Sequence, residues 1–350
     1  MDVQSLTAAL KEEAQRLGFD LVGATPAKTP PDVEHLEKWL VDGMAGEMQY
    51  LAERLEAYRD PNLVLPGVKS ILMLGVNYRT AEPTPTEPGQ GKVSRYAWGS
   101  DYHNVIHDQL EKLAEFHRKL VPECRVRGVV DTAPLLERSF SRQAGIGWIG
   151  KNTLLINSQL GSWLFLAALL TTEELQYDEP SVNSRCGTCR ACLDVCPTGA
   201  IVAPYRLDAR KCISYLTIEL RGAIPEELRE ACGDHLFGCD ICQEVCPWNR
   251  RDIKSSEKQY EPRPGMNPID LAKLFTMDDV DFRERFRDTP LWRAKPYGLL
   301  RNAAVVLGNQ ENENSKAALE KGLQHSNTTV QEACDWAIKS IDNRSRTSSK

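Results

Sequence analysis

Seven cysteines between residues 186 and 246 have spacings that iron–sulfur clusters require. The first run, C-x2-C-x2-C-x3-C-P, supplies Cys186, Cys189, Cys192 and Cys196. The second run, C-x2-C-x3-C-P, supplies Cys239, Cys242 and Cys246. In two-cluster ferredoxins the short gaps bring three thiolates to one [4Fe–4S] cube, and the cysteine before the proline ligates the other cube. We therefore expect one cluster on Cys186, Cys189, Cys192 and Cys246, and a second on Cys196, Cys239 and Cys242.

By this count the second cluster lacks one ligand. Leu236 occupies the position at which a complete second run would have another cysteine. Between the two runs only Cys212 and Cys232 could supply the missing thiolate, and their spacing does not choose between them.

Other uses of these cysteines fit the sequence less well. A structural zinc site needs only four ligands, usually in two C-x-x-C pairs. Disulfides are disfavoured because the first residues lack the basic and apolar regions of a secretion signal. The longest strongly apolar run, Trp163 to Leu170, is too short to span a bilayer. We expect a cytoplasmic protein without a membrane segment, in which reduced thiols and clusters survive.

The surrounding pattern indicates an α+β protein with several domains. Residues 1–180 alternate helical and strand-like segments, which is typical of a layered α/β domain. Residues 181–250 have little apolar periodicity, so we expect a ferredoxin-like module whose metal supplies much of its folding energy. Residues 251–350 begin as a proline-containing linker and continue as short helices. Those helices resemble HEAT-type repeats, although a small helical cap explains them equally well.

Several individual elements can be placed from their periodicity. Helices are expected at 33–41, 45–58, 102–120, 134–144 and 212–221. Strands are expected at 19–24, 69–78, 125–130, 153–157 and 162–171.

Asp131 lies where a predicted strand ends and a predicted helix begins. Ligands of α/β sheets favour the carboxyl ends of strands, so Asp131 could be a general acid if burial raises its pKa. Alternatively, Asp131 or Thr132 simply caps the helix that Pro134 enters. Another acidic–histidine pair, Asp101-x-His103, begins like a cobalt-binding D-x-H-x-x-G signature. Ile106 replaces its glycine, so we do not expect His103 to ligate cobalt.

A basic segment precedes the C-terminal helices. Between residues 283 and 301, six basic residues outnumber two acidic ones in a chain whose net charge is −6. The overall charge argues against a general nucleic-acid coat protein. The local patch, with Trp292 and Tyr297 interleaved, could contact RNA phosphates and bases. The plainer explanation is a solvated helix surface.

Taken together, these residues resemble the epoxyqueuosine reductase family almost from end to end. The similarity is carried by both cysteine runs and by the segments Arg59-Asp60-Pro61, Arg95-Tyr96-Ala97, Asp101-Tyr102-His103, Val130-Asp131-Thr132, Gly147–Thr153, Cys212–Glu219 and Leu300-Arg301-Asn302. The cysteine runs alone would be shared with many ferredoxin-like proteins.

The resemblance implies properties that spacing does not show. It implies cobalamin in the N-terminal domain and two [4Fe–4S] clusters, with Cys212 as the eighth ligand. It implies Asp131 as proton donor and, around the corrin, Arg54, Ser94, Tyr96, Asp131, Lys151, Asn152 and Ser214. The C-terminal helices would hold tRNA, with candidate substrate contacts at Arg138, Arg293, Lys295 and Arg301.

The implied reaction removes the epoxide oxygen of epoxyqueuosine at the tRNA wobble position and leaves an alkene. It consumes two electrons and two protons and releases water. The electrons would come from an external donor such as flavodoxin or ferredoxin, and the protein is expected to be a monomer. Two other functions remain possible: a corrinoid reductive dehalogenase that acts on a small molecule, and an electron-transfer module without catalytic activity.

Overall fold

The computed structural model describes residues 1–310 and 312–348. Its N-terminal half is built on a four-stranded sheet with the order β1 (Leu21–Pro26), β2 (Ser70–Asn77), β7 (Leu164–Thr171) and β4 (Val126–Val129). Every neighbouring pair in this sheet is antiparallel. The rule that places ligands at strand ends describes parallel sheets, so it does not explain where Asp131 lies.

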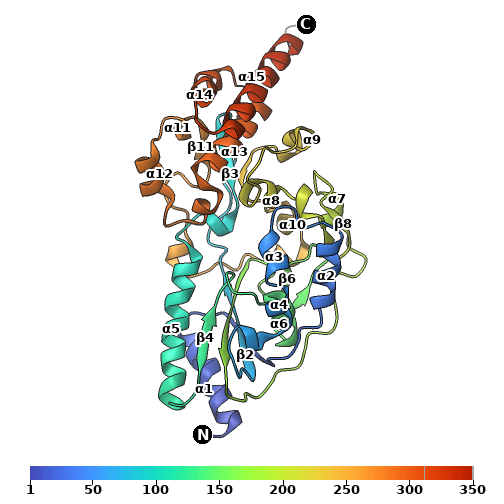
Figure 1. The fold of residues 1–350 in the computed structure, drawn as a ribbon, viewed down its shortest axis with the longest axis vertical. Coiled ribbons are helices and arrows are strands. Elements are labelled where there is room, and N and C mark those ends of the chain that lie inside the picture. The colour runs from blue at the N-terminus through green and yellow to red at the C-terminus, as the bar shows by residue number, and fades with distance from the viewer. Residues whose placement is uncertain (311, 349–350) are drawn as a thin grey trace.

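Helices cover both faces of this sheet. All eight residues of β2 are buried, and successive side chains enter opposite cores. Leu72 and Leu74 pack with α1 (Val3–Arg16) and α5 (Tyr102–Leu120), whereas Ile71 and Met73 pack on the side of α6 (Glu137–Gln143). The result is a three-layer α/β/α arrangement at the N-terminal end of an elongated molecule, with the chain termini at opposite ends (Figure 1). The expected layered α/β architecture is therefore confirmed.

Short helices lie beside the sheet near the cysteine region. They are α2 (Val33–Val41), α3 (Gln49–Glu53) and α4 (Leu55–Arg59). The single helix expected over residues 45–58 is thus wrong, because it is interrupted at Arg54. Arg54 Nη1 donates a hydrogen bond to the Thr132 carbonyl at 3.3 Å, which ties the interruption to the Asp131 loop. The strand expected at 153–157 is only β6 (Leu155–Ile156), which pairs with β5 (Trp148–Ile149).

The cysteine region has little regular structure, as its sequence predicts. Its elements are α7 (Ala191–Asp194), β8 (Ile201–Ala203), β9 (Arg206–Leu207), α8 (Ile213–Ile218), α9 (Glu226–Arg229), β10 (His235–Phe237) and α10 (Ile241–Glu244). The helix expected over 212–221 is shorter, because α8 ends at Ile218.

The C-terminal end is helical (Figure 1). It contains α11 (Leu271–Leu274), α12 (Asp279–Phe286), α13 (Lys295–Asn309), α14 (Lys316–Gly322) and α15 (Thr328–Ser348). Helix α13 is buried over most of its length and packs closely against α15. A Cβ atom at position 308 would lie only 2.8 Å from the Cα of Ala337, so the absence of a side chain at Gly308 lets α13 and α15 pack this closely. None of the described helices has the length and apolar character needed to cross a membrane.

The expected boundaries at residues 180 and 250 do not separate the hydrophobic cores. Strand β3 (Gln90–Val93), from the N-terminal part, pairs with β10 and with β11 (Ile269–Asp270). One core accordingly contains Val93, Phe237 and Leu300 together. The three parts of the chain are therefore interlocked by the segment from β3 to Trp98, which sequence periodicity assigns to the first domain.

Arg301 on α13 is a buried structural residue. Only 1% of its surface is exposed. Its guanidinium donates to the carbonyls of Leu216, Leu220 and Gly222 and to the Asn302 side chain. Desolvation lowers the pKa of Arg301 to about 10. The expectation that Arg301 contacts substrate on the surface is wrong, because its donors satisfy the end of α8 and the turn after it.

We predict that Arg301→Met destabilises the protein by about 3 kcal/mol, because it leaves buried carbonyls without donors. The midpoint of thermal unfolding should fall by several degrees, whereas the exposed Arg287→Met control should leave it within about one degree. Equal midpoints for the two variants would show that the buried hydrogen bonds contribute little.

Candidate functional site

The thiols of the two cysteine runs form two groups. Cys192 lies near Cys186, Cys189 and Cys246, and these neighbours together with burial raise the pKa of its thiol. Cys246 has Cys186 and Cys189 as its own neighbours. The first group therefore combines three cysteines of the first run with the last cysteine of the second.

The second group contains Cys196, Cys212, Cys239 and Cys242. Burial raises the pKa of Cys239 to about 12, and Cys212 and Cys196 add to this effect. Cys242 likewise has Cys239 and Cys212 among its neighbours. Cys232 differs, because burial raises the pKa of its thiol to about 11 and its one charged neighbour is Arg301. Within the described chain, geometry thus favours Cys212 over Cys232 as the fourth member.

These groups are too open for a single metal ion. No three His, Cys, Asp or Glu side chains in residues 1–310 and 312–348 lie close enough to hold one. A cube spaces its four thiolates more widely than tetrahedral zinc does, so two groups of four cysteines suit clusters better.

Neighbouring segments hold the ligand loops by hydrogen bonds to their backbone. Lys151 Nζ donates to the carbonyls of Gly187 and Cys189 at 2.7 and 2.8 Å. Asn152 Nδ2 lies 3.4 Å from the Cys242 carbonyl. Asn302 Nδ2 donates to the carbonyls of Thr217 and Leu236, which fixes α8 relative to β10. The cysteines of both groups are therefore positioned by the N-terminal and C-terminal parts of the chain together.

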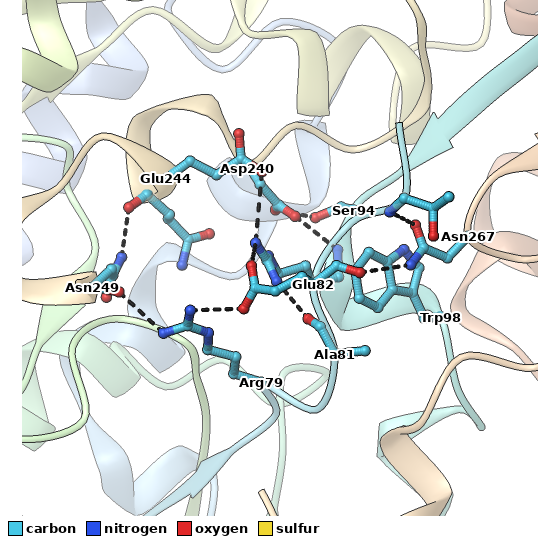
Figure 2. A network of polar contacts seen from close by, with 12 residues as sticks. Arg79, Ala81, Glu82, Ser94, Trp98, Asp240, Glu244, Asn249 and Asn267 are labelled. Carbon is cyan, nitrogen blue, oxygen red and sulfur yellow. Dashed lines mark hydrogen bonds and ion pairs between the residues drawn. The ribbon is translucent and has the colours of Figure 1, made fainter. Parts of the chain in front are cut away.

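A buried polar network connects the second cysteine run to the segment that begins at Ser94 (Figure 2). The Asp240 carboxylate accepts hydrogen bonds from Ser94 Oγ and from the Arg95 amide. Burial raises the pKa of Asp240 to about 6. The Arg95 guanidinium donates to the Ala81 carbonyl at 2.6 Å and pairs with Glu82 at 3.0 Å.

Arg79 extends this network to the end of the second run. It contacts Glu82 at 2.8 Å and the Asn249 carbonyl at 3.1 Å (Figure 2). The loop at residues 79–82 thus fixes the position of the Ser94 turn relative to the end of the second cysteine run.

Asp131 lies in a strained turn directly after β4. Its φ is +54°, a conformation that L-residues rarely adopt and that often marks functional positions. Its amide donates to Glu137 Oε1 at 2.8 Å, so the strain is supported by α6. Its carboxylate faces His103, with 3.3 Å between Oδ2 and Nε2. The other ring nitrogen, Nδ1, lies 2.7 Å from Asp101 Oδ1.

The protonation states in this cluster differ from the sequence-based expectation. The hydrogen bond from His103 holds the pKa of Asp131 below its usual value, so Asp131 is ionised at neutral pH. Desolvation alone would lower the pKa of His103, but the hydrogen bonds to Asp101 and Asp131 outweigh it and raise this pKa to about 9. The condition set for Asp131 as an acid, a pKa raised by burial, is therefore not met in this cluster, and the proton resides on His103.

Asp131 is itself exposed, whereas titratable groups around it are buried. The Asp131 side chain is 62% exposed. Nevertheless, burial raises the pKa of Glu137 to about 8 and the pKa of Tyr96 well above its usual value. Tyr96 has both Asp131 and Asp240 among its charged neighbours. Tyr96 therefore lies between Asp131 and the second cysteine run, and we call the surroundings of Asp131 that Tyr96, Glu137 and Arg138 border the recess.

The residues expected around a corrin fall into two sets. Tyr96, Asp131 and Ser214 lie at this recess or beside Cys212, and Arg54 contacts the Asp131 loop. Ser94, Lys151 and Asn152 instead donate hydrogen bonds to the cysteine segments.

The candidate substrate contacts also lie in different surroundings. Arg138 lines the recess, with Asp131 and Glu137 as charged neighbours, and donates to the Thr153 carbonyl at 2.6 Å. Arg293 forms a bidentate ion pair with Glu219, and its positive charge helps to lower the pKa of Asp131. Lys295 is exposed, with its ammonium 5.8 Å from the Trp292 ring centre.

Sequence reasoning missed the roles of Asp101, His103, Glu137 and Asp240. The Asp101-x-His103 spacing was a usable signal, since the aspartate begins α5 and both side chains project from its first turn. Asp240 and Glu137 carry no comparable signal, because only folding brings them to their partners.

Comparisons with known proteins agree with this arrangement. Residues 185–249 match the family described as "4Fe-4S double cluster binding domain". Residues 59–132 match the family described as "Epoxyqueuosine reductase QueG, DUF1730". A protein of Pseudomonas aeruginosa named epoxyqueuosine reductase is 41% identical over 97% of this chain and 95% of its own length. An Escherichia coli protein of the same name is 38% identical over 97% of this chain and 90% of its own length.

A solved structure extends the similarity to the fold. The crystal structure of an epoxyqueuosine reductase with an epoxyqueuosine-modified tRNA-Tyr stem loop matches with a TM-score of 0.90 and 30% identity. The match covers 97% of this chain and 91% of that one. These near full-length similarities do not support the dehalogenase or the non-catalytic alternative, and the chain belongs to the epoxyqueuosine reductase family.

Proposed function

We propose that this protein reduces epoxyqueuosine to queuosine at the wobble position of tRNA, using cobalamin and two [4Fe–4S] clusters. The observation that carries the proposal is the position of Tyr96, which has both Asp131 and Asp240 of the second cysteine run as charged neighbours, in a chain of this family. Solved relatives support the substrate class, since one of them contains an epoxyqueuosine-modified tRNA stem loop.

The cysteine groups define the proposed ligand sets. Cys186, Cys189, Cys192 and Cys246 hold the first cluster; the second is held by Cys196, Cys212, Cys239 and Cys242. Because each group takes cysteines from both runs, the same loops would hold both clusters, and each cluster would supply one electron at a time.

Cobalamin is proposed to bind between the second cluster and Asp131. The rings of Tyr96 and Tyr102 would border it, since both have Asp131 among their charged neighbours. Bound there, cobalamin supplies a strong nucleophile for opening the carbon–oxygen bond. Tyr96, Ser214 and Arg54 are the proposed lining residues, while Ser94, Lys151 and Asn152 act by holding the cluster loops.

Asp131 is the proposed general acid. Opening an epoxide leaves negative charge on its oxygen, and a positioned acid lowers the barrier where that charge develops. The hydrogen bond from the Asp131 amide to Glu137 supports the strained turn, and the Asp131 carboxylate faces His103.

The C-terminal helices are the proposed tRNA contact, and HEAT-like packing of α13 to α15 would provide the support. Lys295 is available to phosphate, whereas Arg293 and Arg138 lie near Asp131 and could contact the nucleotide that enters. Arg301 takes no part, since it is buried.

An external one-electron donor is proposed to act at the first cluster. Cys189 is exposed, whereas burial strongly raises the pKa of the Cys242 thiol in the second group. Electrons would therefore enter at the first cluster and leave from the second towards cobalamin. Since tRNA is the substrate, we place the protein in the cytoplasm, and we expect a monomer.

The eighth ligand can be tested by a matched pair of substitutions. Cys212→Ser should lose about four of about eight iron atoms, whereas Cys232→Ser should retain them. Iron analysis and electron paramagnetic resonance of anaerobically reconstituted protein would measure both. The opposite pattern would assign the ligand to Cys232.

The general acid can be tested with an isosteric change. Asp131→Asn should lower turnover of epoxyqueuosine-containing tRNA at least about 100-fold while iron and cobalamin contents stay unchanged. The control is Asp108→Asn, an exposed position on α5. Nucleoside mass spectrometry of the product tRNA provides the rate, and wild-type turnover by Asp131→Asn would remove this residue from the mechanism.

The tRNA surface can be tested by charge reversal. Lys295→Glu should weaken tRNA binding about tenfold at low salt, with a smaller effect at high salt. Lys112→Glu, an exposed change in the middle of α5, should have no effect. Filter binding across a salt series measures this, and equal affinities for the two variants would place the tRNA elsewhere.

A further inference from the structure

The reaction needs more protons than Asp131 holds. Removing an epoxide oxygen as water consumes two electrons and two protons, and both protons end on the same oxygen. A single carboxyl can supply one proton at a time. The Asp131 carboxylate, moreover, is ionised at neutral pH, because its hydrogen bond from His103 lowers its pKa. A nearby group must therefore supply the proton that Asp131 passes to the oxygen, once for each of the two protons.

His103 is placed to be that group. Its Nδ1 faces Asp101 Oδ1 at 2.7 Å, and this oxygen also accepts the His103 backbone N–H at 3.0 Å. Because an ionised carboxylate carries no hydrogen, Nδ1 must be the donor in this contact. Nε2 is therefore the ring nitrogen that exchanges its proton, and it faces Asp131 Oδ2 at 3.3 Å.

The imidazole ring is also fixed in orientation. Tyr102 stacks on His103 with 4.1 Å between ring centres, and on its other side stacks on Phe165 at 4.2 Å. The His103 side chain keeps 25% of its surface exposed, so the ring can exchange protons with water. Asp101, at the start of α5, is held by the helix that it caps. The three groups therefore form a directed chain that ends at the recess.

We propose that His103, held between Asp101 and Asp131, is the proton reservoir that loads and reloads Asp131 during turnover. This inference rests on the proposed function. In each transfer the Nε2–H bond of the imidazolium breaks as negative charge develops on the oxygen released from carbon, and Asp131 passes the proton to that oxygen, where the new O–H bond forms. Neutral His103 then regains a proton from water. Two such transfers supply both protons, and no electrons pass through the chain.

The effect of His103 on the pH dependence has to be distinguished from the effects of other titratable groups near Asp131. Glu137 lies on α6 and has a pKa of about 8, so it could titrate in the same pH range. The remaining neighbours of Asp131 keep one charge state near neutral pH: the cations Arg138 and Arg293 and the phenols of Tyr50, Tyr58, Tyr96 and Tyr102.

The first test does not require activity. The protein contains six histidines, so nuclear magnetic resonance of histidine-labelled protein can follow each imidazole. His103 should titrate near pH 9, and Asp131→Asn or Asp101→Asn should move it towards 6.5. The His107→Gln variant, an exposed change on the same helix, should leave the His103 titration unchanged. Titration of His103 near 6.5 in the unmodified protein would overturn the proposal.

The second test uses pre-reduced holoenzyme and tRNA containing epoxyqueuosine in single turnovers. His103→Gln should lower the rate about 100-fold with iron content, cobalamin content and tRNA affinity unchanged. The unmodified rate should fall as pH rises through about 9, and Glu137→Gln should retain this fall. A His103→Gln rate equal to that of the unmodified enzyme would refute the reservoir. Lack of conversion by the unmodified enzyme would instead refute the proposed function, while the titration would still test the proton chain.

Discussion

The convergence of thiols from separate segments is the constraint on which this structure depends. Each proposed cluster takes ligands from both cysteine runs, and the second also takes Cys212 from between them. The module between the runs contains only short helices and strands, so it cannot define these positions through its own core. The rest of the chain therefore has to hold the loops, and it does so mainly through hydrogen bonds to their backbone.

Those supports also connect the cysteines to the catalytic recess. Asn302 joins α8 to β10, and Asp240 joins the second run to the Ser94 turn. Tyr96, two residues after Ser94, borders the recess opposite Asp131. The contacts of Asn302 and of Asp240 each cross a boundary that sequence periodicity places between domains. The electron path and the acid are consequently held by one interlocked scaffold, and the C-terminal helices contribute to it as well as to the proposed tRNA contact.

Much of the chemistry could be predicted from the sequence, because local spacing encodes it. The cysteine runs predicted the ligand pairing that the thiol groups now support, and Asp131 was recognised beside a strand end. Properties that depend on distant contacts could not be predicted. Arg301 looked like a surface cation because its carbonyl partners lie some eighty residues earlier in the chain. The charge of Asp131 depends on His103, which faces it only after folding, and β3 joined an unexpected core for the same reason.

The most direct test of the central claim is conversion of epoxyqueuosine in tRNA by pre-reduced protein without an external donor. Protein containing both clusters and cobalamin should convert substrate in a single turnover, since the reduced centres together supply the two electrons that the reaction needs. The same protein without cobalamin should convert none. Equal conversion in the absence of cobalamin would contradict the account.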